Sequence, residues 1–316
     1  MKNKIPIVFA FDNNLITPAI VCLTSLLENS KASTYYDIYI IHSSKTTLNK
    51  SPFKQFCKIY HNCNITFREV SSQFDSSYEV RGISASTYYR LLIPDLILEY
   101  DKVLYSDVDV IFRDDLTEFS NQDIDGYYLG AVDNCSFIRP DVQKYIRNEL
   151  GLDPQKGYFY AGNIVMNTAL MRSDNIVESF KSLSYKKYNQ QDMDIINIVC
   201  NGRIKALSPA FCVTNYIYEL ILKRETEMLT IYSEQDLHNA LTKGIVHYNG
   251  PKPWKQWCQN FDIWWYYYRK SFIFSEYDAM FFYLSRMSDI DNYSLMKRVK
   301  LLLKYFIRGI RTYNNK

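Results

Sequence analysis

The chain has 316 residues, enough for one large domain with an appendage or for two small domains. Hydrophobic residues make up 47% of it, which is typical of a globular protein and excludes a disordered chain. Because the net charge is only +3, the composition excludes a strongly basic polyanion binder, and we expect no nucleic-acid partner.

Cysteine usage and hydropathy indicate the compartment. The seven cysteines are irregularly spaced and form no CxxC pair, so we expect reduced, mostly buried thiols rather than a zinc or dithiol site. The N-terminal apolar run is too short for a signal peptide, and no stretch reaches the roughly 18 apolar residues of a membrane span. We therefore expect a cytoplasmic protein.

Strands and helices alternate along the first part of the chain. Apolar runs predict strands at residues 5–11, 36–42, 65–70 and 102–106. Helical patterns predict helices at residues 17–28, 48–60 and 84–98. Thr17 and Pro18 suit the N-cap and first turn of the first helix, and Pro94 should break or kink the third. This alternation predicts an α/β fold with a mainly parallel sheet flanked by helices.

The pattern after residue 110 is mixed. Strand-like segments follow at residues 127–133, 159–167 and 244–247, and helix-like segments at 169–183 and 192–200. Residues 261–268 read FDIWWYYY, and the last 30 residues are basic. We expect a catalytic domain at residues 1–257 and a helical extension at residues 258–316.

A helix predicted from Leu295 onward has two opposite faces. Its basic face carries Lys297, Lys300, Lys304, Arg308 and Arg311. Its apolar face carries Leu295, Val299, Leu302, Leu303, Phe306 and Ile310. Such a helix suits peripheral attachment to an anionic membrane or contact with a lipid-linked acceptor. The alternative is that its apolar face packs on the catalytic domain and leaves the lysines in solvent.

The Asp107-Val108-Asp109 triplet follows the strand predicted at residues 102–106. Open α/β sheets bind ligands at the carboxyl ends of their strands. Two carboxylates at such a place repel each other unless a cation lies between them, and hard divalent metals favour oxygen ligands. The triplet therefore predicts a metal site, although a polar strand end in a turn would read the same way.

The same residues raise a competing function. The segment DVDV also matches the DxDx[TV] nucleophile motif of haloacid-dehalogenase-type phosphatases. That motif normally comes near the start of its domain, whereas 106 residues precede Asp107 here, and no convincing set of later partners follows. A metal-dependent phosphatase stays the second alternative.

A second cluster of chemistry-bearing residues reads His247-Tyr-Asn-Gly250-Pro-Lys252-Pro-Trp254. A neutral imidazole is a suitable third metal ligand beside two carboxylates. Gly250 permits close approach of the backbone to a phosphate, and Lys252 offers a positive charge to it. The alternative is a Gly-Pro turn with a structural histidine.

Together these motifs resemble glycosyltransferase family 8, which includes lipopolysaccharide galactosyl- and glucosyltransferases and glycogenin. The resemblance covers residues 5–257. It implies a GT-A fold, retention of anomeric configuration, a manganese ion (with magnesium as the alternative) and UDP-glucose or UDP-galactose as donor. The carbohydrate acceptor would be lipid-linked or protein-linked.

The resemblance also implies roles for individual residues. Ala10, Asp12 and Asn14 in FAFDNN match the uridine-binding loop, and Arg90 matches an arginine that contacts the donor. Asp107 and Asp109, with Val108 between them, match the metal-binding DxD motif, and His247 matches the third metal ligand. Asp133, Ala161, Gly162 and Asp192 match residues beside the donor sugar. The candidate catalytic residues are Asp133, Asp192 and Arg90. Gly250 and Lys252 match contacts to the diphosphate.

Two positions depart from the family pattern. Tyr160 replaces an asparagine in YFYAGN, and Met193 replaces a glutamine in the segment DMD. A methionine side chain cannot donate a hydrogen bond to a sugar or a leaving group. The first alternative to an active transferase is therefore a UDP-sugar-binding protein of the same fold with weakened or lost catalysis.

Overall fold

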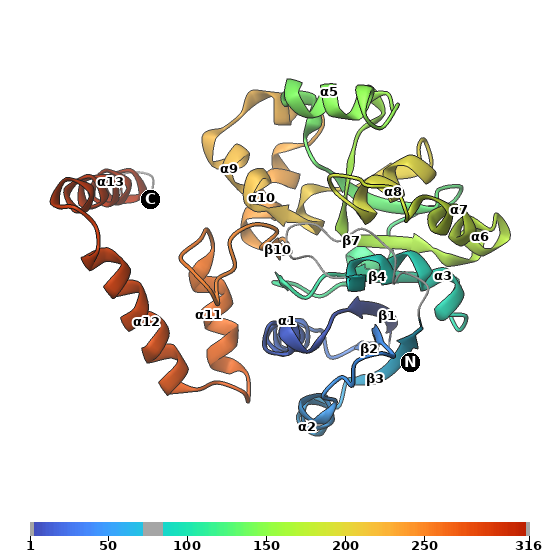
Figure 1. The fold of residues 1–316 in the computed structure, drawn as a ribbon, viewed down its shortest axis with the longest axis horizontal. Coiled ribbons are helices and arrows are strands. Elements are labelled where there is room, and N and C mark those ends of the chain that lie inside the picture. Colours follow the sequence, from blue (N-terminus) through green and yellow to red (C-terminus); the bar gives the residue numbers. More distant parts are fainter. Residues whose placement is uncertain (1–2, 72–84, 314–316) are drawn as a thin grey trace.

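The computed structural model describes residues 3–71 and 85–313, and its body is built on a seven-stranded sheet in the order β3-β2-β1-β4-β7-β6-β8 (Figure 1). The strands are β1 (Asn3–Ala10), β2 (Thr34–Ser43), β3 (Cys63–Val70), β4 (Lys102–Ser106), β6 (Leu129–Asp133), β7 (Phe159–Asn167) and β8 (Ile204–Ala206). Pairing is parallel except along β7, which is antiparallel to both β4 and β6. The predicted α/β fold with a mixed, mainly parallel sheet is confirmed.

Helices pack on both faces of this sheet. They are α1 (Ile16–Glu28), α2 (Ser51–Ile59), α3 (Ile93–Leu96), α4 (Thr117–Ser120), α5 (Pro140–Asn148), α6 (Thr168–Ser173), α7 (Ile176–Leu183), α8 (Asp192–Val199), α9 (Asn215–Lys223) and α10 (Glu234–Thr242). In β1, Ile7 and Phe9 join one core cluster and Val8 joins the other, because successive strand side chains point to opposite faces. Each face of the sheet therefore has its own hydrophobic core.

A second, smaller sheet joins segments that are far apart in the chain. It consists of β5 (Val110–Ile111), β10 (Val246–His247) and β9 (Val213–Thr214), in the order β5-β10-β9. Strand β10 is antiparallel to β5 and parallel to β9. The sequence analysis predicted the strand that contains β10, but not β5 or β9, because two-residue strands carry too short a pattern to be recognised.

The predicted N-cap of the first helix was wrong. Helix α1 begins at Ile16 without a side-chain cap from Thr17, because Asp12 caps a preceding 3₁₀ turn, Asn13–Leu15. Residues 85–96 are helical as predicted, but most of them form a 3₁₀ helix, Ala85–Leu92, that leads into α3; residue 84 lies outside the described part of the chain. Pro94 lies in the first turn of α3, where proline starts a helix rather than breaking one.

Three helices form the C-terminal part: α11 (Phe261–Lys270), α12 (Glu276–Asp291) and α13 (Leu295–Tyr313). The aromatic side chains of α11 pack against Val21, Ile111 and Val246, whereas α12 and α13 lead away from the sheet (Figure 1). Trp264 is 2% exposed in this packing. Helix α11 thus has extensive apolar contact with the body, and the division between residues 257 and 258 stays a prediction.

Truncating Trp264 measures how strongly α11 is joined to the body. We expect Trp264→Ala to lower the free energy of unfolding of the main transition by about 3–5 kcal/mol, because a large buried side chain leaves a cavity. Urea denaturation followed by fluorescence and circular dichroism checks this. The matched control is Tyr266→Ala on the same helix: Tyr266 is 49% exposed. An unchanged main transition in Trp264→Ala would show that the extension unfolds separately.

Candidate metal centre

The acidic pair lies directly after β4, at the carboxyl end of this central strand. The Asp107 backbone N–H donates to the Gly162 carbonyl at 2.8 Å, which holds the first acid beside β7. Strand β5 begins at Val110, so Asp109 is held by the small sheet. The Val108 side chain is buried in the core between them. The main sheet and the small sheet therefore fix one carboxylate each.

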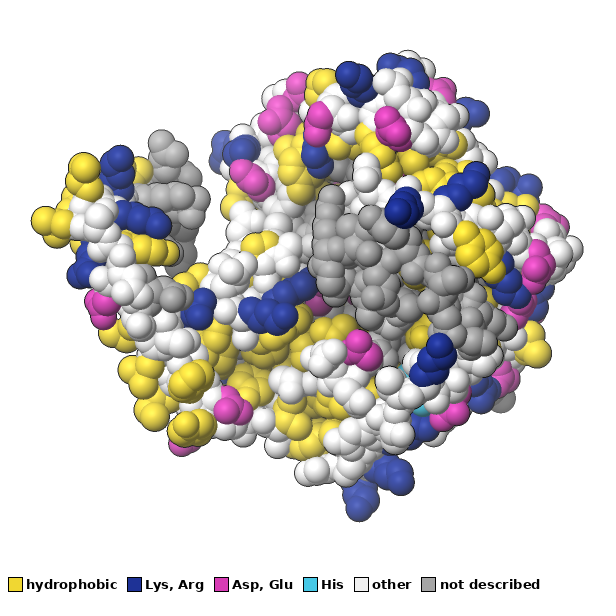
Figure 2. Space-filling view, in the orientation of Figure 1, with side chains coloured by type: hydrophobic (Ala, Val, Ile, Leu, Met, Phe, Trp, Pro, Cys, Tyr) yellow, Lys and Arg dark blue, Asp and Glu magenta, His cyan; other side chains and the backbone are white. Residues whose placement is uncertain are grey.

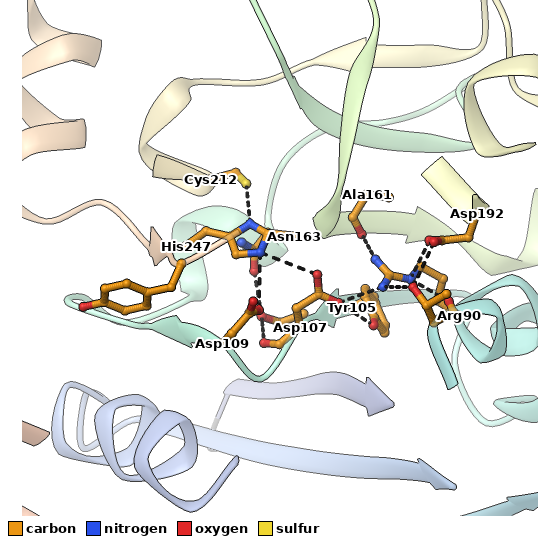
Figure 3. Close-up of polar contacts among 12 residues, drawn as sticks. Arg90, Tyr105, Asp107, Asp109, Ala161, Asn163, Asp192, Cys212 and His247 are labelled. Atoms are coloured by element: carbon orange, nitrogen blue, oxygen red, sulfur yellow. Dashed lines mark hydrogen bonds and ion pairs between the residues drawn. The ribbon is translucent and has the colours of Figure 1, made fainter. Parts of the chain in front are cut away.

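The small sheet also delivers the third residue of the cluster. His247 is paired with Val110 across β5 and β10. Its Nε2 atom lies 3.3 Å from Asp109 Oδ1 and 3.6 Å from Asp107 Oδ2 (Figure 3). One oxygen from each acid and one histidine nitrogen all lie within 4.8 Å of one another. The structure thus brings together the three residues predicted to hold a metal, and this donor set suits a hard divalent cation.

Positive side chains offset the charge of the acidic pair. Lys252 Nζ donates to Asp109 Oδ2 and, at 2.6 Å, to the Tyr248 carbonyl. Burial alone would raise the pKa of Asp109, but His247 and Lys252 outweigh it and hold the pKa well below its usual range. Burial would lower the pKa of His247, but Asp109 outweighs it and raises the pKa to about 10. The pocket therefore stabilises positive charge at the point between the two acids.

Arg90 links the acidic pair to a third carboxylate. Its guanidinium forms ion pairs of 2.9 Å with Asp107 Oδ1 and with Asp192 Oδ2, and donates to the Ala161 carbonyl at 2.7 Å (Figure 3). It is 6% exposed and lies over the Tyr105 ring, 4.5 Å from the centroid. Burial favours the neutral guanidine, but Asp107 and Asp192 outweigh it and raise the pKa of Arg90. Arg90 is therefore a buried bridge and not a surface helix residue.

Asp192 is the first residue of α8 and lies at the far end of this bridge. Its Oδ1 accepts a hydrogen bond of 2.9 Å from the Thr87 hydroxyl. Burial raises the pKa of Asp192 to about 6, although the attraction of Arg90 opposes the rise. A carboxylate in this position can accept hydrogen bonds from sugar hydroxyls while Arg90 and Thr87 hold it in place.

Gly162 leaves room for His247 and Asp107. A Cβ atom at this position would lie 2.3 Å from His247 Cε1 and 2.7 Å from Asp107 Oδ2. Such distances are far inside van der Waals contact, so any other residue would push the two ligands apart. Residue 162 therefore has to be glycine, because β7 approaches His247 so closely at this point.

Other predicted site residues lie outside the contacts of this cluster, as far as the described residues show. Asp133 accepts from the backbone N–H groups of Cys135 (2.7 Å) and Tyr158 (3.1 Å), and burial raises its pKa to about 6. Asp12 caps the turn at Asn14. Gly250 has Asn215 as its neighbour, and Ala10 ends β1, which pairs with β4. We expect these residues to contact a bound nucleotide sugar and not the cluster itself.

Asp194 lies in the first turn of α8, two residues after Asp192. Asp194 is fully buried, and it accepts hydrogen bonds from the Tyr145 hydroxyl (2.6 Å), the Tyr158 hydroxyl and the Gln190 backbone N–H (2.8 Å). These bonds fix the segment before α8, whose N-cap residue Gln191 has a φ of 48°. Asp194 thus holds the turn that presents Asp192.

The two departures from the family pattern have distinct surroundings. The Tyr160 hydroxyl accepts a bond of 3.2 Å from the Thr214 hydroxyl, and burial raises its pKa. The Met193 side chain packs against the core cluster on its face of the sheet. Tyr160 is therefore tied to the strand next to β10, and Met193 contributes packing rather than a polar group.

Sequence reasoning missed several neighbours of the cluster. Tyr105 donates to Asp107 at 2.8 Å, and its position two residues earlier on the same strand was a usable signal. Thr87, three residues before Arg90, also bonds to the guanidinium and could have been found from that spacing. Cys212, whose Sγ lies 3.5 Å from His247 Nδ1, gave no signal because it is distant in sequence.

Comparison with known proteins agrees with this architecture. A mixed sheet of this order, with an acidic pair after its central strand, is that of the GT-A glycosyltransferases: the structure of galactosyltransferase LgtC with donor and acceptor sugar analogues superposes with a TM-score of 0.70. That match has 23% identity and covers 86% of this chain and 98% of the LgtC chain, so it shows the fold.

The chain belongs to glycosyl transferase family 8, whose family model matches residues 6–258. A Haemophilus influenzae protein named as a glycosyltransferase is 29% identical over 80% of this chain and 74% of its own length. Lipopolysaccharide 1,2-glucosyltransferase of Escherichia coli is 23% identical over 80% of this chain and 73% of its own length. The predicted family is confirmed, and the match spans the DVDV segment, so the phosphatase alternative loses its support.

The close contact at Gly162 can be tested without substrate. We expect Gly162→Ala to weaken Mn²⁺ binding by at least about 10-fold, because the added methyl group displaces two of the three ligands. Mn²⁺ titration followed by electron paramagnetic resonance checks this. The control is Gly250→Ala, whose Cβ would meet only Asn215 Nδ2 at an ordinary 3.4 Å. Equal Mn²⁺ affinity in both variants would contradict the placement of the metal between Asp107 and His247.

Proposed function

We propose that this protein is a retaining, metal-dependent glycosyltransferase that moves glucose or galactose from a UDP-hexose to a carbohydrate acceptor. The acceptor would belong to a cell-surface glycan or a glycoprotein glycan, and would be lipid-linked or protein-linked. The observation that carries the proposal is the cluster of Asp107, Asp109 and His247 at the carboxyl end of β4, with its ligand atoms within 4.8 Å. Membership of glycosyl transferase family 8 supports it.

The residues present suit a bound Mn²⁺ or Mg²⁺ ion. Asp109 already attracts the cationic Lys252 and His247 in this structure, so the position favours positive charge. Asp107, Asp109 and His247 would hold the ion, and the mixed oxygen and nitrogen set favours Mn²⁺ over Mg²⁺. When bound, the ion supplies Lewis-acid stabilisation of the diphosphate.

Different residues of the chain would bind different parts of the donor. We assign the uridine to the loop of Ala10, Asp12 and Asn14, and the diphosphate to Gly250 and Lys252. The Lys252 ammonium stabilises negative charge as UDP departs. Asp192, held by Arg90, accepts hydrogen bonds from the sugar hydroxyls, and the backbone at Ala161 and Gly162 lies beside the sugar.

The engagement of the nearby carboxylates supports a front-face reaction. Asp133 is bound by two backbone N–H groups, Asp192 by Arg90 and Thr87, and Asp194 by two tyrosines. Each of the three carboxylates is thus already held by other groups of the chain, which favours a reaction without an enzymatic nucleophile. The acceptor oxygen forms its bond to the sugar C1 on the face from which the phosphate oxygen leaves, and a phosphate oxygen takes the acceptor's proton.

A second function is favoured by one observation. Tyr160 is tied to Thr214, and Met193 packs into the core, so neither offers the polar group that the family pattern has at these positions. A UDP-sugar-binding protein of the same fold with weakened catalysis would show these features. It would bind the donor and release little UDP.

The decisive experiment incubates the protein with Mn²⁺ and each UDP-hexose, with and without candidate acceptors, and measures UDP release. We expect turnover with one UDP-hexose and its abolition in Asp109→Asn, because an amide is a poor substitute for a carboxylate as metal ligand. The control is Asp101→Asn, whose side chain is 89% exposed. Donor binding without turnover would favour the second function, and Mn²⁺-free turnover in Asp109→Asn would contradict the metal role.

We also propose that the protein is cytoplasmic and that α12 and α13 contact the inner face of the cell membrane. Within the described residues, no helix is both long and apolar enough to cross a bilayer. On α12, exposed apolar side chains recur at helical spacing: Tyr277, Met280, Phe281, Leu284 and Met287. Figure 2 shows hydrophobic side chains along this C-terminal arm. An apolar stripe of this kind suits insertion at a lipid interface.

The predicted amphipathic helix continues this surface. On α13, the apolar residues Leu295, Leu302 and Phe306 are 79%, 69% and 67% exposed, so they do not pack on the catalytic domain. Lys297 and Lys300 carry positive charge on the other face of the helix, which complements anionic lipid headgroups. The side chains of Lys304, Arg308, Ile310 and Arg311 lie outside the described part of the chain.

Liposome cosedimentation tests this contact. We expect the Lys297→Glu/Lys300→Glu double variant to bind phosphatidylserine-containing vesicles at least about 30-fold more weakly, because each basic residue contributes about 1 kcal/mol. Removal of residues 290–316 should weaken binding further. The matched control, Lys54→Glu/Lys58→Glu, reverses the charge of two exposed lysines on α2. Equal loss in the two double variants would mean that net charge alone drives binding.

A further inference from the structure

The ring of His247 has a contact on the side opposite the acids. Its Nδ1 atom lies 3.5 Å from the sulfur of Cys212, which is fully buried (Figure 3). Its Nε2 atom faces Asp109 and Asp107. The imidazole therefore spans the distance between a thiol and the acidic pair, and each of its nitrogens has a different partner.

The backbone fixes Cys212 in this place. Cys212 directly precedes β9, and β9 pairs with β10 in parallel, with Thr214 opposite His247. The Val213 N–H donates to the Ile245 carbonyl at 2.7 Å, which continues the ladder on the Cys212 side. Because β5 borders β10 on its other edge, the small sheet brings Asp109 and Cys212 to His247 from its two neighbouring segments.

The main sheet confines the His247 ring on another side. The Gly162 position on β7 approaches His247 so closely that a Cβ atom there would lie 2.3 Å from Cε1, the ring carbon between the two nitrogens. Movement of the ring toward β7 is therefore blocked. Gly162 at the Cε1 edge and Cys212 at Nδ1 therefore hold the ring from two sides, and when the imidazole is neutral its one proton can reside on either nitrogen.

That proton decides whether His247 can bind a metal. A neutral imidazole carries one N–H, and only the other nitrogen offers a lone pair to a metal. Nε2 is the nitrogen that faces the acids, so the proton has to reside on Nδ1 and needs an acceptor there. Metal-binding histidines generally donate this N–H to a carboxylate, a carbonyl or water, and the partner fixes the ring and its tautomer.

We propose that Cys212 is a positioning residue that accepts the Nδ1–H of His247 through its sulfur and thereby directs Nε2 at the metal. This rests on the proposed assignment of His247 as a metal ligand. Sulfur is a weak acceptor, so the thiol orients the ring while adding little electron density to it. The spacing of the seven cysteines predicts only reduced, mostly buried thiols, and this contact gives one of them a role in the site.

Mn²⁺ affinity, measured by electron paramagnetic resonance in the absence of donor, tests the role independently of turnover. We expect Cys212→Val, which stays apolar but loses the sulfur acceptor, to weaken Mn²⁺ binding by about 10-fold or more, within the range of losses at supporting residues. The midpoint of urea unfolding should stay that of the wild type. Cys200→Val is the matched control, because Cys200 is equally buried in the other core cluster.

A second pair of variants separates the acceptor from packing. Cys212→Ala and Cys212→Ser are both smaller than cysteine and differ by one hydroxyl group, which can accept the Nδ1–H. We expect the serine variant to bind Mn²⁺ more tightly than the alanine variant. Equal affinities in this pair, or wild-type affinity in Cys212→Val, would overturn the role of Cys212 and leave the metal assignment intact. Failure of the wild-type protein to bind Mn²⁺ would overturn both.

Discussion

The repulsion between Asp107 and Asp109 is the constraint on which the site depends. Both carboxylates are held by backbone pairing at the end of a buried strand, so they cannot separate to relieve it. Positive groups from three other segments offset their charge: Arg90 at Asp107, and His247 and Lys252 at Asp109. The elements that carry these groups are therefore fixed relative to β4 by charge as well as by packing.

Arg90 extends this constraint toward the other half of the sheet. Through one guanidinium, the position of Asp107 is coupled to that of Asp192 at the start of α8. Asp194 and its two tyrosines fix the preceding turn, so the carboxylate beside the proposed donor sugar has little freedom. Metal, diphosphate and sugar would thus be located by one connected set of buried polar contacts.

The sequence predicted six of the seven strands of the main sheet, all but β8, and the grouping of Asp107, Asp109 and His247, because these leave a local signature. The runs before Asp107 and the motif at His247 are short and specific, and family resemblance joined them. The small sheet was missed in part, since β5 and β9 have two residues each. The role of Cys212 and the burial of Asp194 depend on which distant segments meet, and no local pattern records that.

The three-stranded small sheet also has a consequence for how the chain is made. Asp109 and Lys252 are 143 positions apart, so a ribosome releases the acidic pair long before its cationic partners at β10. Until β10 arrives, β5 has no neighbour in that sheet and Asp109 has neither His247 nor Lys252. Closure of this cluster therefore requires β10, and a chain that stops before Val246 lacks it.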